Sequence, residues 1–150
     1  NPIALDKICS TMAEKFSEEN IELVVGAAIG GILLAGGTGK YLNSKHIFSE
    51  RVNGEMKFRR GFQIEEGTRV LIVEDIVSTG GSIVELINLL KEYKADLVGM
   101  VCIVNRSQKN IVFDARFESL LNFPSESWEE NECPEWLLKK PIVKPGSTGK

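Results

Sequence analysis

The spacing of hydrophobic residues changes from segment to segment in the first third of the chain. Residues 5–16 place apolar side chains three or four positions apart with charges between them, which predicts an amphipathic helix. Residues 21–25 are almost continuously apolar, which predicts a short buried strand. A glycine-rich turn follows at 26–31, and the apolar stretch 32–35 then predicts a second helix. The glycines within 36–39 are expected to interrupt it, because each costs a helix interior roughly 1 kcal/mol relative to alanine.

A β-hairpin is predicted next. Residues 45–51 suit a strand, and the Asn53-Gly54 dipeptide is a strong signal for a tight hairpin turn. The returning strand is therefore predicted over residues 55–62. Its cationic residues are Lys57, Arg59 and Arg60. Alone they would be solvated surface charges, whereas beside a phosphate site they would contribute to binding.

A continuous apolar run in residues 69–74 predicts a strand buried on both faces, which ends at the Glu74-Asp75 pair. A loop of small residues follows this strand. Ser82 and Glu85 then fit a capping box, so the very apolar helix of residues 83–93 is predicted to begin at Ser82.

Two more strands complete the pattern, a buried one over residues 97–104 and a weaker one within 111–123. Because strands and helices alternate, we predict an α/β fold, a mostly parallel twisted sheet with helices on both faces plus the hairpin. Residues 1–150 form a single domain, with a loosely packed tail over 124–150. The chain begins Asn1-Pro2 without an initiator methionine, so a further N-terminal segment is expected in the natural protein.

Composition narrows the classes of partner. Eighteen Lys and Arg against 21 Asp and Glu give a net charge of −3, which argues against nucleic acid or an acidic membrane surface as a partner. No apolar run approaches the roughly 18 residues of a membrane span. Cys9, Cys102 and Cys133 form no CxxC pair and suit a reducing compartment, so we expect a cytoplasmic protein. Cys102 is expected to be a small buried hydrophobe, and the single histidine, His46, to be structural or exposed.

Residues 70–82 carry the most informative chemistry. Two adjacent carboxylates, Glu74 and Asp75, end a buried strand at the sheet edge where open α/β sheets bind ligands. The Ser, Thr and Gly residues that follow, together with a helix N-terminus, favour a bound phosphate. Carboxylates beside such a cradle would repel a second anion but can accept hydrogen bonds from neutral hydroxyls. The combination predicts a sugar phosphate rather than a nucleoside triphosphate.

Two nucleotide-binding motifs are excluded. Residues 37–40 look like the end of a Walker A loop, but Leu34 stands where the earlier glycine is required and Tyr41 where Ser or Thr is. The G-x-G-x-x-G pattern is absent after both buried strands of the first half. A simple helix cap would explain the end of the 70–82 segment but not the two carboxylates that close an apolar strand.

Residues 70–82, VLIVEDIVSTGGS, resemble the phosphoribosyl-pyrophosphate (PRPP) motif of the type I phosphoribosyltransferases. Within that family the chain is most similar to the orotate phosphoribosyltransferases, over about residues 21–145. The matching stretches are VVGAAIGG at 24–31, IFSERVNGEMKFRRGF at 47–62, CIVNRS at 102–107 and KPIVKPGS at 140–147. The resemblance implies a Rossmann-like fold. It also implies transfer of phosphoribosyl from PRPP to orotate, giving orotidine 5′-monophosphate and diphosphate in pyrimidine (UMP) biosynthesis.

The resemblance further implies roles at the donor site. Glu74 and Asp75 would hold the ribose 2′ and 3′ hydroxyls, residues 78–82 would wrap the 5′-phosphate, and the loop 27–31 would meet the diphosphate. Lys57 would be catalytic together with Glu74 and Asp75. The implied PRPP-binding set is Ala27, Ala28, Gly30, Arg51, Arg59, Arg60, Glu74, Asp75, Ile76, Val77, Ser78, Thr79, Gly80, Gly81 and Ser82.

For the base, the resemblance implies that Arg106 pairs with the orotate carboxylate and that Ser78 touches both substrates. Mg²⁺ is the implied cofactor, held mainly by the substrate rather than directly by protein ligands. The basic hairpin matches a mobile hood that closes over the active site of a neighbouring subunit, which implies a homodimer with shared sites.

The chain departs from the family pattern at several positions. Ala27 and Ser78 stand where many members have Pro and Thr, glycines at 36–39 are expected to interrupt a helix that is continuous in relatives, and the CPEW stretch at 133–136 resembles a CPxC ending without its second cysteine. The family's N-terminal segment also has no match here. Two alternatives stay open. A purine-type phosphoribosyltransferase is disfavoured by Arg106, which suits an anionic base. A non-catalytic PRPP-binding regulator is disfavoured by the hairpin cations, because a regulator has no leaving group to stabilise.

Overall fold

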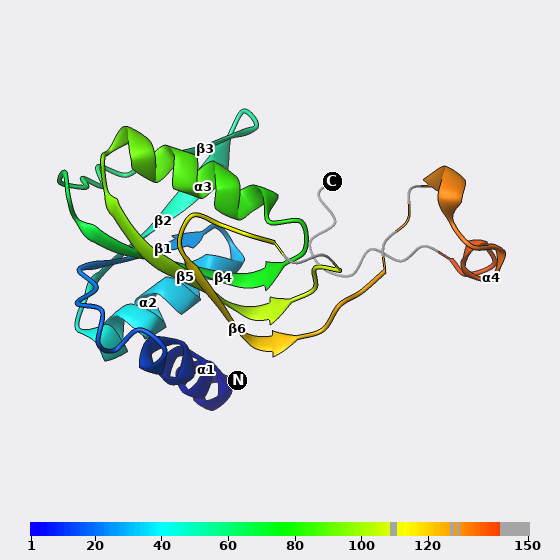
Figure 1. The fold of residues 1–150 in the computed structure, drawn as a ribbon, viewed down its shortest axis with the longest axis horizontal. Helices are drawn as coiled ribbons and strands as arrows, with labels where there is room; N and C mark the ends of the chain where they lie inside the picture. The colour runs from blue at the N-terminus through cyan, green and yellow to red at the C-terminus, as the bar shows by residue number, and fades with distance from the viewer. Residues whose placement is uncertain (109–110, 127, 129, 142–150) are drawn as a thin grey trace.

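The computed structural model describes residues 1–108, 111–126, 128 and 130–141. Their strands form a six-stranded sheet in the order β3-β2-β1-β4-β5-β6 (Figure 1). Neighbouring strands are parallel except β2 and β3, which form the antiparallel hairpin at one edge. The elements are α1 (Pro2–Glu14), β1 (Leu23–Ala27), α2 (Gly30–Leu42), β2 (Lys45–Val52), β3 (Glu55–Phe58), β4 (Arg69–Val77), α3 (Gly81–Glu92), β5 (Asp96–Asn105), β6 (Arg116–Asn122), the 3-10 helix η1 (Glu130–Glu132) and α4 (Glu135–Leu138).

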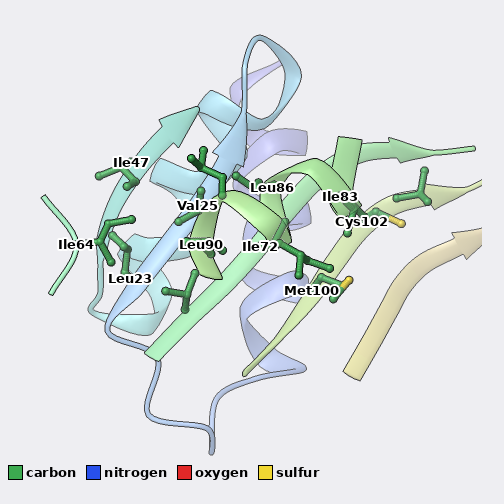
Figure 2. Packing of buried hydrophobic residues seen from close by; sticks show 14 residues of the cluster. Leu23, Val25, Ile47, Ile64, Ile72, Ile83, Leu86, Leu90, Met100 and Cys102 are labelled. Carbon is green, nitrogen blue, oxygen red and sulfur yellow. The ribbon is translucent and has the colours of Figure 1, made fainter. Parts of the chain in front are cut away.

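Helices cover both faces of the sheet, which confirms the predicted α/β architecture. Helices α1 and α2 pack on one face and α3 on the other (Figure 1). Successive residues of a strand point to opposite faces. Val24 and Leu71 therefore join the α1–α2 core, whereas Val25 and Ile72 join the α3 core shown in Figure 2. Cys102 is fully buried in the α3 core, as predicted.

The structure corrects the prediction that glycines interrupt the second helix. Helix α2 runs unbroken through Gly36, Gly37 and Gly39. A Cβ on Gly37 would collide with the Cys9 side chain of α1, and one on Gly39 would lie 3.1 Å from the Ser44 carbonyl oxygen. Gly37 and Gly39 therefore allow α1 and the turn into β2 to approach α2, and this packing offsets their low helix propensity.

Two strand boundaries also differ from the sequence prediction. Strand β4 does not end at the Glu74-Asp75 pair but continues to Val77, because Ile76 and Val77 pair with Val104 and Asn105 of β5. Strand β3 stops at Phe58 instead of residue 62. Arg60 has a φ of 62° and Gly61 of 72°, so the chain turns at these residues and cannot extend the strand.

The predicted capping box at the start of α3 is wrong. The helix begins at Gly81, and its N-cap is Gly80, which has a φ of 80° and makes no side-chain cap bond. Glu85 instead forms an ion pair with Arg51 of β2, at 2.8 Å between Oε2 and Nη2. The helix start is therefore set by a left-handed glycine, and Glu85 links α3 to the hairpin.

In the predicted tail, the Trp128 and Trp136 rings pack edge to face with centroids 6.3 Å apart. Helix α4 is drawn apart from the sheet in Figure 1. Most of the family-like ending at 140–147 lies outside the described residues. No helix in the described part of the chain combines the length and apolar character needed to cross a membrane.

Candidate active site

The carboxyl ends of β1, β4 and β5 meet at one edge of the sheet, and three pockets adjoin there. The first, of about 210 Å³, lies over the loop 78–82 at the start of α3. The second, of about 290 Å³, lies between the loop 27–30 and the carboxylates of β4. The third, of about 460 Å³, surrounds Arg106. Three kinds of surface therefore meet at one edge, namely a helix N-terminus, a carboxylate pair and an arginine.

Shared lining residues connect the three pockets. Glu74, Ile76 and Ser82 line both the first and the second pocket. Ser78 and Thr79 line both the first and the third. The predicted residues of the 70–82 motif are thus brought together, and one ligand can extend from Arg106 past the loop 78–82 to the carboxylates.

The carboxylate pair is held by the main chain of β4. The Asp75 N–H donates to Glu74 Oε1 at 3.0 Å, and the Ile76 N–H donates to Asp75 Oδ1 at 2.7 Å. Glu74 is only 8% exposed. Burial, reinforced by the neighbouring Asp75 side chain, raises the pKa of Glu74 to about 7. Asp75 lies against the start of α2, where a Cβ on Gly30 would collide with its carboxylate.

The loop 78–82 lines the first pocket and packs against Phe113. Gly80 adopts its positive φ with Phe113 directly above it, so that a Cβ would lie 3.1 Å from the Phe113 ring. Thr79 Oγ1 accepts a hydrogen bond from the Gly81 N–H at 3.4 Å. The first N–H groups of α3 have no partner within the helix. Hydroxyl groups and a helix N-terminus at one pocket suit a bound phosphate.

The loop 27–30 forms a tight turn between β1 and α2. A Cβ on Gly26 would collide with the Gly31 backbone. The lack of a side chain at Gly26 therefore allows the end of β1 to contact the start of α2. The peptide bond between Ala28 and Ile29 is cis. The Ala28 N–H donates to the Ser49 carbonyl at 2.8 Å and so anchors the loop on β2.

One cation of the predicted hood, Arg51, lines the second pocket. Its guanidinium pairs with Glu85 of α3 and donates to the Gly54 carbonyl oxygen in the hairpin turn. Arg51 therefore faces the carboxylate pocket while bound to two neighbouring elements. Sequence reasoning assigned Glu85 to a helix cap and missed this contact, because the two residues are 34 positions apart.

The other hood cations, Lys57, Arg59 and Arg60, do not line these three pockets. Along β3, Met56 rather than Lys57 faces the second pocket, because adjacent strand residues point to opposite faces. Lys57 pairs instead with Glu55 at 2.8 Å on the exposed side. The roles implied for these cations therefore remain predictions that need a different hairpin position or a second subunit.

Arg106 and Ser78, the two residues expected at the base site, both line the third pocket, and Ser125 lines it too. Arg106 Nε donates to Ser125 Oγ at 2.9 Å. The remaining lining residues are Thr79, Ser107, Gln108 and Ile111. Sequence reasoning missed Ser125 because it lies 19 residues after Arg106, beyond β6 and outside the recognised motifs.

Comparison with known proteins agrees with this geometry. The family model for the phosphoribosyl transferase domain matches residues 1–134. The orotate phosphoribosyltransferase of Caldicellulosiruptor bescii is 42% identical over 149 residues, which cover 99% of this chain and 78% of the relative. The enzyme of that name from Thermotoga maritima is 41% identical over 144 residues, which cover 96% of this chain and 77% of the relative.

Solved structures share the fold at lower identity. The adenine phosphoribosyltransferase of Rhodothermus marinus has a TM-score of 0.69 at 22% identity and covers 82% of this chain and 81% of its own. UMP synthase of Leishmania donovani has a TM-score of 0.69 at 21% identity, over 81% of this chain and 28% of its own. The similarity to these two solved structures establishes the fold alone. The family model and the sequence relatives establish the family. The chain belongs to the phosphoribosyltransferase family, and its relatives at 40–45% identity are orotate phosphoribosyltransferases.

Proposed function

We propose that this chain is the subunit of an orotate phosphoribosyltransferase, which transfers phosphoribosyl from PRPP to orotate and releases diphosphate. The observation that carries the proposal is the set of three adjoining pockets at one sheet edge. The first suits the 5′-phosphate at loop 78–82, and the third suits an anionic base at Arg106. The second suits the ribose at Glu74 and Asp75 and the diphosphate at the loop 27–30 and Arg51. The names of the relatives support the same reaction.

The donor would lie along the motif of residues 70–82. The loop 78–82 and the N-terminus of α3 bind the 5′-phosphate. Glu74 and Asp75 accept hydrogen bonds from the ribose 2′ and 3′ hydroxyls. The loop 27–30 and Arg51 border the diphosphate. The two ends of PRPP are thereby fixed on either side of the anomeric carbon, which positions that carbon for attack.

Bond cleavage separates charge, and the protein groups match that separation. As the anomeric C–O bond breaks, positive charge develops on the ribose ring and negative charge on the departing diphosphate. Carboxylates lie at the ribose end of the site, whereas Arg51 and the hood cations serve the diphosphate end. A ring nitrogen of orotate forms the new bond to the same carbon and loses its proton, which passes to solvent or to the departing diphosphate. The step needs little acid–base chemistry from the protein.

Mg²⁺ is the proposed cofactor. The diphosphate and the ribose hydroxyls would supply most of the oxygen ligands that this ion prefers, while Glu74 and Asp75 would hold those hydroxyls. Bound there, Mg²⁺ would neutralise charge on the leaving group. Within the described residues no group of three or more His, Cys, Asp or Glu side chains is arranged to hold a metal.

Two further parts of the proposal concern assembly and location. The hood cations Lys57, Arg59 and Arg60 lie outside the pockets of their own subunit, which supports a homodimer in which each hairpin serves the partner's site. Closure of the hairpin would exclude water and so suppress hydrolysis of PRPP. A cytoplasmic location is proposed from the sparse, unpaired cysteines.

The proposal is tested by measuring diphosphate release from PRPP and Mg²⁺ with orotate, adenine, xanthine or no base. Release with orotate alone is the expected result. Release with a purine base would replace the proposal by a purine-type transferase. Tight PRPP binding without release for any base would favour a PRPP-binding regulator.

A further inference from the structure

Arg106 makes three hydrogen bonds, to Val77 and Ser125, at the edge of the third pocket. Its N–H donates to the Val77 carbonyl at 2.7 Å. Its own carbonyl accepts from the Ser125 N–H at 3.2 Å, and its side-chain Nε donates to Ser125 Oγ at 2.9 Å. Ser125 therefore binds both the main chain and the side chain of Arg106, and it lines the same pocket.

The Ser125 contact determines which N–H donors of the Arg106 guanidinium group are left to bind a ligand. Arginine carries five N–H donors in a planar fork, and a carboxylate can bind either the Nε side or the two terminal nitrogens. Because Nε is already engaged by Ser125, the terminal pair Nη1 and Nη2 remains for a carboxylate. This pair forms two parallel hydrogen bonds with a carboxylate in its own plane.

We propose that Ser125 is a positioning residue for base recognition. Its hydroxyl holds the exposed Arg106 side chain in the rotamer that presents Nη1 and Nη2 to the carboxylate of the base. Ser125 thereby determines selectivity for a carboxylated pyrimidine over one without the carboxylate. The inference rests on the proposed function, since it requires that Arg106 meets the carboxylate of orotate.

The test compares two nucleotides that differ only in this carboxylate. Dissociation constants of orotidine 5′-monophosphate and uridine 5′-monophosphate are measured by calorimetry on the full chain. Ser125→Ala is expected to weaken orotidine 5′-monophosphate roughly three- to tenfold and to leave uridine 5′-monophosphate unchanged. Ser125→Thr keeps the hydroxyl and is expected to retain the selectivity. Ser119→Ala is the matched control, since its hydroxyl donates to Asn122 Oδ1 at 2.9 Å on β6.

A double-mutant cycle separates positioning from a general structural role. Arg106→Ala is expected to abolish the preference for the carboxylated nucleotide, and adding Ser125→Ala is expected to change nothing further. Unaltered selectivity in Ser125→Ala, or an equal loss in Ser119→Ala, would overturn the role of Ser125. Failure of the unmodified protein to prefer orotidine 5′-monophosphate would instead overturn the proposed function, and the inference with it.

Discussion

The motif of residues 70–82 and the β2–β3 hairpin are proposed to act on one donor, yet they are built in opposite ways. The motif comes from an inner strand, with β1 on one side and β5 on the other, and its Glu74 is 8% exposed. The hairpin lies at the sheet edge, and the side chains of Lys57 and Arg60 are 51% and 61% exposed. The motif therefore holds its side chains in fixed positions, whereas the hairpin carries exposed positive charge.

The difference extends to how each region holds its charges. Lys57 and Arg60 are paired with carboxylates of the same hairpin, Glu55 and Glu50. Exposed ion pairs contribute little to stability, so these cations can exchange their partners for a diphosphate at small cost. Glu74, by contrast, cannot leave its buried site, and its environment opposes ionisation. The motif is suited to binding the donor in one fixed geometry. The hairpin cations are suited to changing their partners.

The largest expected effect concerns a hairpin cation. Lys57→Ala is predicted to lower kcat roughly 100-fold while the dissociation constant for PRPP changes little, because the proposed role of Lys57 is to act on charge that develops as diphosphate leaves. Steady-state kinetics and PRPP titration measure the two quantities. Lys45→Ala, at the far end of β2, is the control. Equal losses in kcat and PRPP affinity would mean that Lys57 only anchors the bound donor.

Mixing variants then tests whether the hairpin serves the partner's site. Lys57→Ala and Asp75→Asn subunits, each defective alone, are exchanged in equal amounts. If the hairpin acts across a dimer, half of the dimers are mixed and each has one intact site, so about a quarter of the original activity returns. No recovery after proven subunit exchange would restrict the hairpin to its own subunit.

A second prediction uses the buried charge of the motif. The folded-state pKa of Glu74, about 7, lies above its ordinary value of 4.5. Folding stability from this group is therefore complete below pH 4.5 and is lost as pH rises through 7, by up to roughly 3 kcal/mol. Urea unfolding from pH 4.5 to 7.5 should show this fall, and Glu74→Gln should remove it.

Glu118→Gln provides the control for that measurement. The hydrogen bond from Lys15 holds the pKa of Glu118 below its usual value, so the stability it contributes is lost only as pH falls below the ordinary range. This variant should keep the slope between pH 4.5 and 7. An unchanged slope in Glu74→Gln would assign the pH dependence to another group and weaken the contrast between motif and hairpin.

A third prediction concerns the close approach of α2 to the carboxylate pair. Gly30→Ala places a methyl group against the Asp75 carboxylate. Because the site is tightly packed, the change is expected to displace that carboxylate and weaken PRPP binding roughly tenfold. Gly36→Ala, in the same helix and 3.6 Å from His46 Nε2, has room for its methyl and should leave binding unchanged. Equal PRPP affinity in Gly30→Ala would show that Asp75 does not depend on this contact.

The sequence predicted the features that depend on neighbouring residues and missed those that depend on contacts distant in the chain. Strands, helices and the carboxylate pair of residues 70–82 follow from local patterns, because each depends on neighbours within a few positions. The α2 glycines could not be understood locally, since Gly37 is required by Cys9 of another helix. The prediction of a capping box was wrong for a related reason. Gly80 starts α3 with its left-handed backbone, which leaves Glu85 to pair with a distant arginine.

The proposed base site shows the same limit. Arg106 was found through its motif, but Ser125 has no local signal, because their contact joins the ends of two separate strands. The ion pairs of Lys57 with Glu55 and of Arg60 with Glu50 did not follow from residue type. Long-range pairing therefore decides which predicted residues share a pocket.

The smallest expected effect lies where the two regions touch. Glu85 of α3 and Arg51 of the hairpin form a half-exposed pair beside the second pocket. Glu85→Gln is predicted to leave the melting temperature unchanged, because such pairs are weak in water. It should raise the KM for PRPP two- to threefold at low salt, since Arg51 is no longer held at the pocket, and less at about 1 M salt. Glu92→Gln removes the same charge at the end of the same helix and should have no effect. A lower KM in Glu85→Gln would reverse the interpretation, because Glu85 would then compete with diphosphate for Arg51 instead of positioning it.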